Sequence, residues 1–153
     1  MKTLNTYIRE KLDVNEDYSR QYNYQPKNTR ELESLLKRLI AERGNEGDFN
    51  DIDTSLITNM AWLFEEKYIF NGDISRWDTS NVTTMHAMFS KATKFNQDIS
   101  KWNTSNVTDM TSMFKHAKSF NQDISGWNVN KVLHHESMFT DCPIKDSYKP
   151  KFK

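Results

Sequence analysis

Three groups of side chains in this sequence are of the types that carry chemistry, and the first is the run His134, His135 and Glu136. Imidazole and carboxylate groups bind metals and exchange protons. Adjacent residues on a helix do not face one another, however, and no histidine pair has the i, i+4 spacing of a His-Glu-x-x-His site. We therefore expect structural or surface roles for this run, with no metal and no catalytic residue.

The second group is an aspartate that recurs every 25 residues, at Asp73, Asp98 and Asp123. A ladder of carboxylates could bind calcium, but calcium takes roughly six to eight oxygen ligands, several of them from one loop. Each repeat offers one Asp and one Asn at this place. An Asp side chain also accepts hydrogen bonds from nearby backbone N–H groups in turns, and this is the role we predict.

The third candidate is Cys142, the single cysteine, which rules out an intrachain disulfide. It takes the place of an alanine in the other repeats and is predicted to be a small buried hydrophobe. The chain has only four glycines and no glycine-rich phosphate loop. We expect no cofactor, no small-molecule substrate and no enzymatic activity.

All three candidates lie in a repeated sequence. Residues 70–94, 95–119 and 120–144 align without gaps, and a degenerate copy begins at Gly47. A fixed period of this size indicates stacked units that bury apolar faces against one another. We predict an asparagine ladder (Asn71, Asn96, Asn121) between the units. The predicted structural columns are Ile74, Ile99 and Ile124; Trp77, Trp102 and Trp127; and Phe70, Phe95 and Phe120.

Each repeat divides into two parts. The second part has helical spacing, in the first full copy at Val82, Met85, Met88, Phe89 and Ala92. The first part, 73–77, carries a β-branched and an aromatic residue and favours a short strand. The sequence therefore predicts an α/β repeat solenoid, leucine-rich-repeat-like, with about four strand-plus-short-helix turns and a narrow parallel sheet.

The segments outside the repeats are predicted to cover the ends of the solenoid. Leu32, Leu35, Leu36, Leu39 and Ile40 form one stripe of a helix over 28–44, with Asn28 or Thr29 as N-cap and Gly44 at its end. We divide the chain into an N-terminal helix and tyrosine-rich arm (1–27), a capping helix (28–46), the solenoid (47–144) and a basic tail (145–153). The tail is expected to be frayed, and His135 is expected to meet solvent or a partner.

The repeat pattern FNxDISxWxTSNVTxMxxMF resembles the BspA-like leucine-rich repeat of bacterial surface proteins. The similarity covers about residues 48–144. The resemblance implies a curved strand-plus-helix solenoid and a role in binding other macromolecules. This sequence differs from those proteins in its short length, its own N-terminal segment and the lack of a secretion signal.

We expect a non-catalytic protein-binding repeat module whose partner is another protein or a ribonucleoprotein, with nucleic acid as an alternative. A second hypothesis is an anti-CRISPR-like inhibitor of a host defence machine, encoded by a phage or mobile element. A third is a fragment of a bacterial surface or adhesion protein. Candidate partner-binding residues are those of the arm and of positions that vary between copies or lie near the C-terminal end: Tyr18, Tyr22, Tyr24, Arg76, Lys101, Lys115 and His134.

Composition agrees with this expectation. The 153 residues include 21 basic and 21 acidic side chains, so no global charge indicates a polyanion or a membrane partner. The sequence contains no apolar run of the length that a signal peptide or a membrane span requires. We expect a cytoplasmic location.

Overall fold

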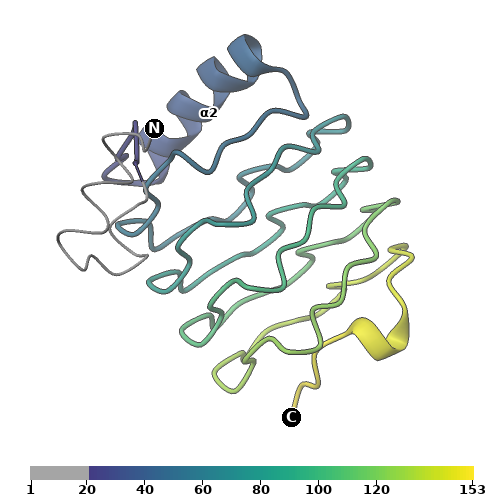
Figure 1. Ribbon diagram of the computed structural model, residues 1–153. Coiled ribbons are helices and arrows are strands. Elements are labelled where there is room, and N and C mark those ends of the chain that lie inside the picture. Colours follow the sequence, from purple (N-terminus) through teal and green to yellow (C-terminus); the bar gives the residue numbers. More distant parts are fainter. Residues whose placement is uncertain (1–20) are drawn as a thin grey trace, which may run out of the picture.

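The computed structural model describes residues 21–153, so the predicted N-terminal helix and most of the tyrosine-rich arm lie outside it. Its helices are α2 (Thr29–Arg43) and the short 3-10 helix η2 (Asp146–Tyr148). Between them the chain winds into a stack of irregular rungs that runs from α2 towards η2 (Figure 1). We number these 25-residue rungs 1 to 4, for residues 45–69, 70–94, 95–119 and 120–144.

The predicted fold class, an α/β repeat solenoid with a parallel sheet, is wrong. Residues 45–144 contain no α-helix and no β-strand. The β pairing found within residues 21–153 consists of isolated parallel bridges. Three of them join one position from rung to rung, Asn59 to Thr84, Thr84 to Asp109 and Asp109 to His134. Successive rungs therefore meet without forming a sheet.

The stretch predicted to be helical in each rung is a series of β-turns. In rung 2 the N–H groups of Met88, Ser90 and Ala92 donate to the carbonyls three residues earlier, at 3.2, 3.1 and 3.0 Å. Ala87 and Lys91 have φ of 49° and 61°, as the third position of a type II turn requires. The equivalent residues of the other rungs also have positive φ: Trp62, Glu66, Ser112, His116, Ser137 and Asp141.

In an α-helix, backbone N–H groups donate to carbonyls of the same helix. Here, N–H groups of each rung donate instead to carbonyls of the next rung. The four bonds from rung 2 to rung 3 run from Met85 to Asp109, from Ala87 to Thr111, from Phe89 to Met113 and from Lys91 to Lys115, at 2.7–2.9 Å. Rungs 1 and 2, and rungs 3 and 4, are joined by the same four bonds. This set of bonds explains why the β-turn stretch (residues 60–67, 85–92, 110–117 and 135–142) is not an α-helix.

The interior of the stack is a set of columns of side chains. Phe89 stacks between Phe64 and Phe114, with ring centroids 5.4 and 5.6 Å apart. Phe95 of a neighbouring column lies 4.0 Å from Phe89. All nine residues of the predicted columns are buried: Ile74, Ile99, Ile124, Trp77, Trp102, Trp127, Phe70, Phe95 and Phe120. Alignment of identical rings from rung to rung thus fills the core.

Polar side chains pair the rungs along the rest of the backbone. The Oδ1 atom of Asn71 accepts a hydrogen bond from the Asn96 N–H at 2.9 Å, and Asn96 accepts one from the Asn121 N–H at 3.0 Å. The predicted asparagine ladder is therefore confirmed. The Oδ1 atom of Asn121 continues it by accepting from the N–H of Lys145 at 3.0 Å.

Helix α2 forms where the sequence predicts a helix. The side chain of Asn28 accepts a hydrogen bond from the Glu31 N–H at 3.0 Å, which satisfies one free donor of the first turn. Gly44 ends the helix with a φ of 81°. Leu32, Leu36 and Leu39 belong to the same buried cluster as the apolar side chains of rung 1. No helix within residues 21–153 has both the length and the apolar character needed to cross a membrane.

The C-terminal residues pack on rung 4, so the prediction of a frayed tail is wrong. The Ile124 N–H donates to the carbonyl of Tyr148 at 3.0 Å, and Pro150 is buried. Phe152 stacks on the His135 ring with centroids 4.0 Å apart. His135 is exposed, as expected, and one side of its ring contacts the chain's own tail.

Candidate functional site

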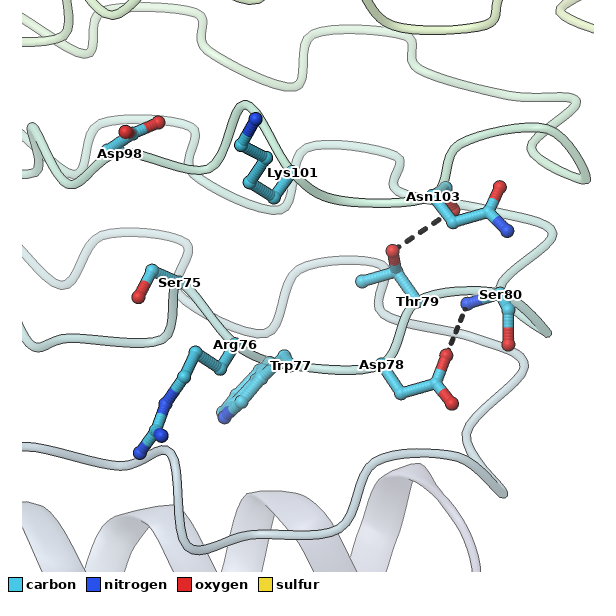
Figure 2. Close-up of a pocket in the computed structure, with 9 residues that line it drawn as sticks. All are labelled: Ser75, Arg76, Trp77, Asp78, Thr79, Ser80, Asp98, Lys101 and Asn103. Atoms are coloured by element: carbon cyan, nitrogen blue, oxygen red, sulfur yellow. Dashed lines mark hydrogen bonds between the residues drawn. The ribbon is translucent and has the colours of Figure 1, made fainter. Parts of the chain in front are cut away.

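A hollow on the described surface lies on the extended parts of rungs 2 and 3. It has a volume of about 630 Å³. Figure 2 shows that side chains of two successive rungs surround it. Its lining comes from residues 75–80 of rung 2 and from Asp98, Lys101 and Asn103 of rung 3.

Bonds to the rungs on either side fix the floor of this groove. Trp77 is buried, and its Nε1–H donates to the carbonyl of Phe49 in rung 1 at 3.0 Å. The Thr79 hydroxyl donates to the carbonyl of Asn103 at 3.0 Å. Because both bonds cross between rungs, the groove is a rigid feature of the stack rather than of a loose loop.

Two cations project from the groove, Arg76 in rung 2 and Lys101 in rung 3 (Figure 2). Both residues are exposed. Neither side chain forms an ion pair or a hydrogen bond with any residue in the range 21–153. Lys91 of the stack, by contrast, pairs with Glu66 at 2.6 Å, whereas Lys67, Lys94 and Lys115 are unpaired like the two groove cations within residues 21–153. Their charges act on the nearby carboxylates of Asp73 and Asp98 only through space, and both help to lower the pKa values of these groups. The groove thus offers two exposed charges without a direct partner among residues 21–153.

The acidic groups beside these cations are held in turns. The carboxylates of Asp78 and Asp98 accept the N–H groups of Ser80 and Ser100 at 2.9 and 3.0 Å. Hydrogen bonds from the hydroxyl and then from the N–H of Ser100 lower the pKa of Asp98 below its usual value. A carboxylate with a lowered pKa stays ionised at neutral pH and is a poor proton donor. The groove therefore presents a fixed pattern of both charge signs, which suits recognition.

The other predicted chemical groups have structural partners. Asp73 and Asp123 accept the N–H groups of Ser75 and Ser125, each at 3.0 Å, so the predicted turn role is confirmed. Burial raises the pKa of the Cys142 thiol, which makes it a weak nucleophile at neutral pH. Among the side chains of residues 21–153, no three His, Cys, Asp or Glu groups lie close enough to hold a metal ion.

The predicted partner-binding residues do not form one surface. Arg76 and Lys101 line the groove, whereas Lys115 and His134 lie in or beside the β-turn stretches, where their carbonyls accept N–H groups of the preceding rung. Tyr24 is half-buried and pairs with Ile52 of rung 1 in a parallel bridge. Tyr22 is half-buried, and Tyr18 lies outside the described residues.

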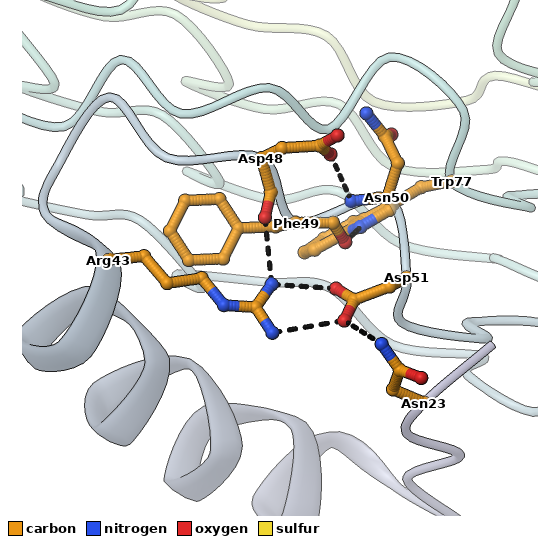
Figure 3. Close-up of polar contacts among 7 residues, drawn as sticks. All are labelled: Asn23, Arg43, Asp48, Phe49, Asn50, Asp51 and Trp77. Carbon is orange, nitrogen blue, oxygen red and sulfur yellow. Dashed lines mark hydrogen bonds and ion pairs between the residues drawn. The ribbon is translucent and has the colours of Figure 1, made fainter.

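A polar cluster beneath α2 explains why rung 1 has no cation at the position that Arg76 and Lys101 occupy in rungs 2 and 3. Asp51 holds the rung position of Arg76 and Lys101. It accepts two hydrogen bonds from the Arg43 guanidinium, at 2.7 and 3.0 Å, and one from Asn23 at 2.8 Å (Figure 3). The hydrogen bonds from Arg43 are the main cause that lowers the pKa of Asp51. At this repeat position, rung 1 therefore uses its side chain, Asp51, to bind α2, whereas rungs 2 and 3 expose theirs to solvent.

Rung 1 also carries exposed apolar residues that the sequence analysis missed. The exposed large side chains of this rung are Leu56, Trp62, Tyr68 and Ile69. Rungs 2 and 3 have Asn81 and Asn106 in place of Leu56, and Ala87 and Ser112 in place of Trp62. A comparison of rung 1 with its later copies, position by position, would have found this difference.

Comparison with known protein families gives a match over most of the chain. The model of the family described as "Mycoplasma protein of unknown function, DUF285" matches residues 30–150. This range includes most of α2, all four rungs and η2. No curated protein and no solved structure matches the chain.

Proposed function

The chain belongs to the DUF285 family, and from this premise we propose that it is a non-catalytic protein-binding repeat module. The partner surface is the groove of rungs 2 and 3, with Arg76 and Lys101 as its charged anchors. The observation that carries the proposal is that these two exposed cations line one groove together, without an ion pair within residues 21–153, on a floor bonded to neighbouring rungs through Trp77 and Thr79.

A binding role also agrees with how the remaining side chains are used. The repeated Asp, Asn and Trp residues bind turns or neighbouring rungs, and the pKa of Asp98 is lowered rather than raised. General acid catalysis at neutral pH calls for a raised carboxyl pKa. The resemblance of the repeats to BspA-like surface proteins points in the same direction, towards contacts with another macromolecule.

Charge reversal in the groove tests this proposal. We expect Arg76→Glu combined with Lys101→Glu to abolish capture of the partner protein in affinity purification with quantitative mass spectrometry. Each substitution turns an attractive charge into a repulsive one where the partner docks, and such pairs change affinity by several kcal/mol, about a thousandfold in the dissociation constant.

The matched control is Lys67→Glu combined with Lys94→Glu. Both residues are exposed and lie away from the groove, and the change of net charge is identical. Partners that are kept by this control and lost with the groove variant support the proposal. Equal capture by the two folded variants would remove the groove as the binding surface.

A further inference from the structure

The last rung ends the stack with a row of free backbone donors. In rungs 1 to 3 four N–H groups of the β-turn stretch donate to the next rung. The matching groups of rung 4 are those of His135, Ser137, Phe139 and Asp141, and none of them donates to an acceptor in residues 21–153. Ser137 and Asp141 keep the positive φ of the earlier rungs, at 56° and 54°. The edge therefore has the conformation that binds a following rung elsewhere in the chain.

This edge presents donors without acceptors. The carbonyls of His135, Ser137 and Phe139 accept N–H groups within rung 4, from Met138, Thr140 and Cys142, at 3.1–3.2 Å. The carbonyls between them accept bonds from rung 3. The edge of a β-strand shows N–H and C=O groups in alternation. The N–H groups of an added β-strand would therefore find no acceptor on this edge.

The complement of this edge is a row of carbonyls alone, and each rung shows that row to the rung before it. A second copy of this chain does not offer it freely. The Thr29 hydroxyl beside α2 already donates to the carbonyl of Asn59 in rung 1 at 2.6 Å. Ala61 and Leu63, the next residues of that row, are only 5% and 6% exposed.

We propose that this C-terminal edge docks the first rung of another chain built from the same 25-residue repeat, one whose first rung is not covered by a helix. The interface continues the one that joins the rungs of this chain, with four N–H to C=O bonds and stacked side chains. Such a contact is heterologous, and α2 limits it to one end of the chain.

The tail competes with this partner. Phe152 stacks on His135, in the position where a residue of a fifth rung would lie, and Lys149 lies 5.5 Å from the Phe139 ring centroid. The tail also holds fifth-rung positions on the extended part of rung 4, where the Ile124 N–H donates to the Tyr148 carbonyl and the Lys145 N–H donates to Asn121. Docking thus requires Phe152 and the rest of the tail to leave, whereas the four donors of the β-turn stretch are already free.

Amide hydrogen exchange of the full chain, measured by NMR, tests the proposal. The probe is a chain of four copies of residues 95–119 without α2. In the full chain alone we expect the amides of His135, Ser137, Phe139 and Asp141 to exchange at least about tenfold faster than their equivalents in rung 3. With saturating probe we expect them to slow to the rung 3 rates, in a complex that sedimentation velocity resolves.

Phe152→Ala should tighten this complex, by about tenfold in the dissociation constant, because the competing ring is gone. Lys153→Ala, at the exposed terminus, is the matched control and should not change it. No slowing with a folded probe, slowing at another surface, or self-association of the full chain alone would each overturn the proposal.

A second chain keeps the test decisive if the probe does not fold. In it, one further copy of residues 95–119 is inserted between Ile144 and Lys145. The proposal requires the amides of His135, Ser137, Phe139 and Asp141 to slow in this longer chain. Unchanged fast exchange at all four would contradict it.

Discussion

At the scale of single residues, the tryptophans of rungs 2 to 4 serve two purposes. Trp102 is 4% exposed, and its Nε1–H donates to the carbonyl of Ile74 in the preceding rung at 3.2 Å. The Nε1–H groups of Trp77 and Trp127 make the same bond, at 3.0 and 3.1 Å. Each ring fills the core and also supplies a buried donor that finds its acceptor in the preceding rung.

Replacement of Trp102 by Phe should therefore lower the free energy of unfolding by about 2 kcal/mol. The smaller ring leaves a cavity and the bond to Ile74 is lost. Urea unfolding followed by circular dichroism measures the change. Trp62→Phe is the control, because Trp62 is 56% exposed, and it should change stability by less than about 0.5 kcal/mol. Equal losses in the two variants would refute the role assigned to the indole bond.

At the scale of the element, the β-turn stretch depends on residues that adopt a left-handed backbone without being glycine. Ser112 has a φ of 57°, and its N–H donates to the carbonyl of Glu136 at 2.9 Å. A non-glycine residue in this region costs roughly 1–2 kcal/mol. The bonds to the next rung offset that cost, since they form only when the N–H groups point along the stack.

Substitutions at Ser112 should rank in the order Gly, Ser, Val from most to least stable. Val should lower the free energy of unfolding by about 1–2 kcal/mol, because a β-branched side chain crowds a left-handed backbone. Ser119→Val is the control at an exposed residue without positive φ and should have little effect. Urea unfolding gives the ranking. If Val proved as stable as Gly, the turn would not depend on this conformation.

At the scale of the whole molecule, carboxylates paired with neighbouring groups make the stack sensitive to acid. Hydrogen bonds are the main reason why the pKa values of three aspartates are lowered: from Arg43 to Asp51, from the Ser100 hydroxyl to Asp98 and from the Ser125 hydroxyl to Asp123. Their pKa values in the folded chain lie below the ordinary value of 3.8. The stability they contribute is present above that value and is lost as the pH falls through the folded values.

The free energy of unfolding should accordingly be level near neutral pH and fall below about pH 4. Asp51→Asn should lower stability at pH 7 and make the acid fall shallower, because its charge no longer attracts Arg43. Urea unfolding at a series of pH values, for both chains, measures the two slopes. Parallel curves for the two chains would show that Asp51 does not contribute to the acid response.

The period and its columns were determined by the sequence alone. When copies of a 25-residue repeat stack, identical residues of successive copies come into contact. The buried columns of Ile, Trp and Phe and the asparagine ladder could therefore be predicted from the sequence. The same holds for α2, because Asn28, the leucine stripe and Gly44 are local signals. Arg76 and Lys101 vary between the copies and so could be named from the sequence, but the groove that they line exists only in the tertiary structure.

Only the tertiary structure decided what backbone the repeats adopt. Apolar residues at i, i+3 and i+7 lie on one side of both a helix and a series of β-turns, so the spacing of Met85, Met88 and Ala92 does not separate the two. The choice rests on where the N–H groups find acceptors. For Met85 that acceptor is the carbonyl of Asp109, 24 residues away, and a bond of this kind exists only once the rungs have stacked.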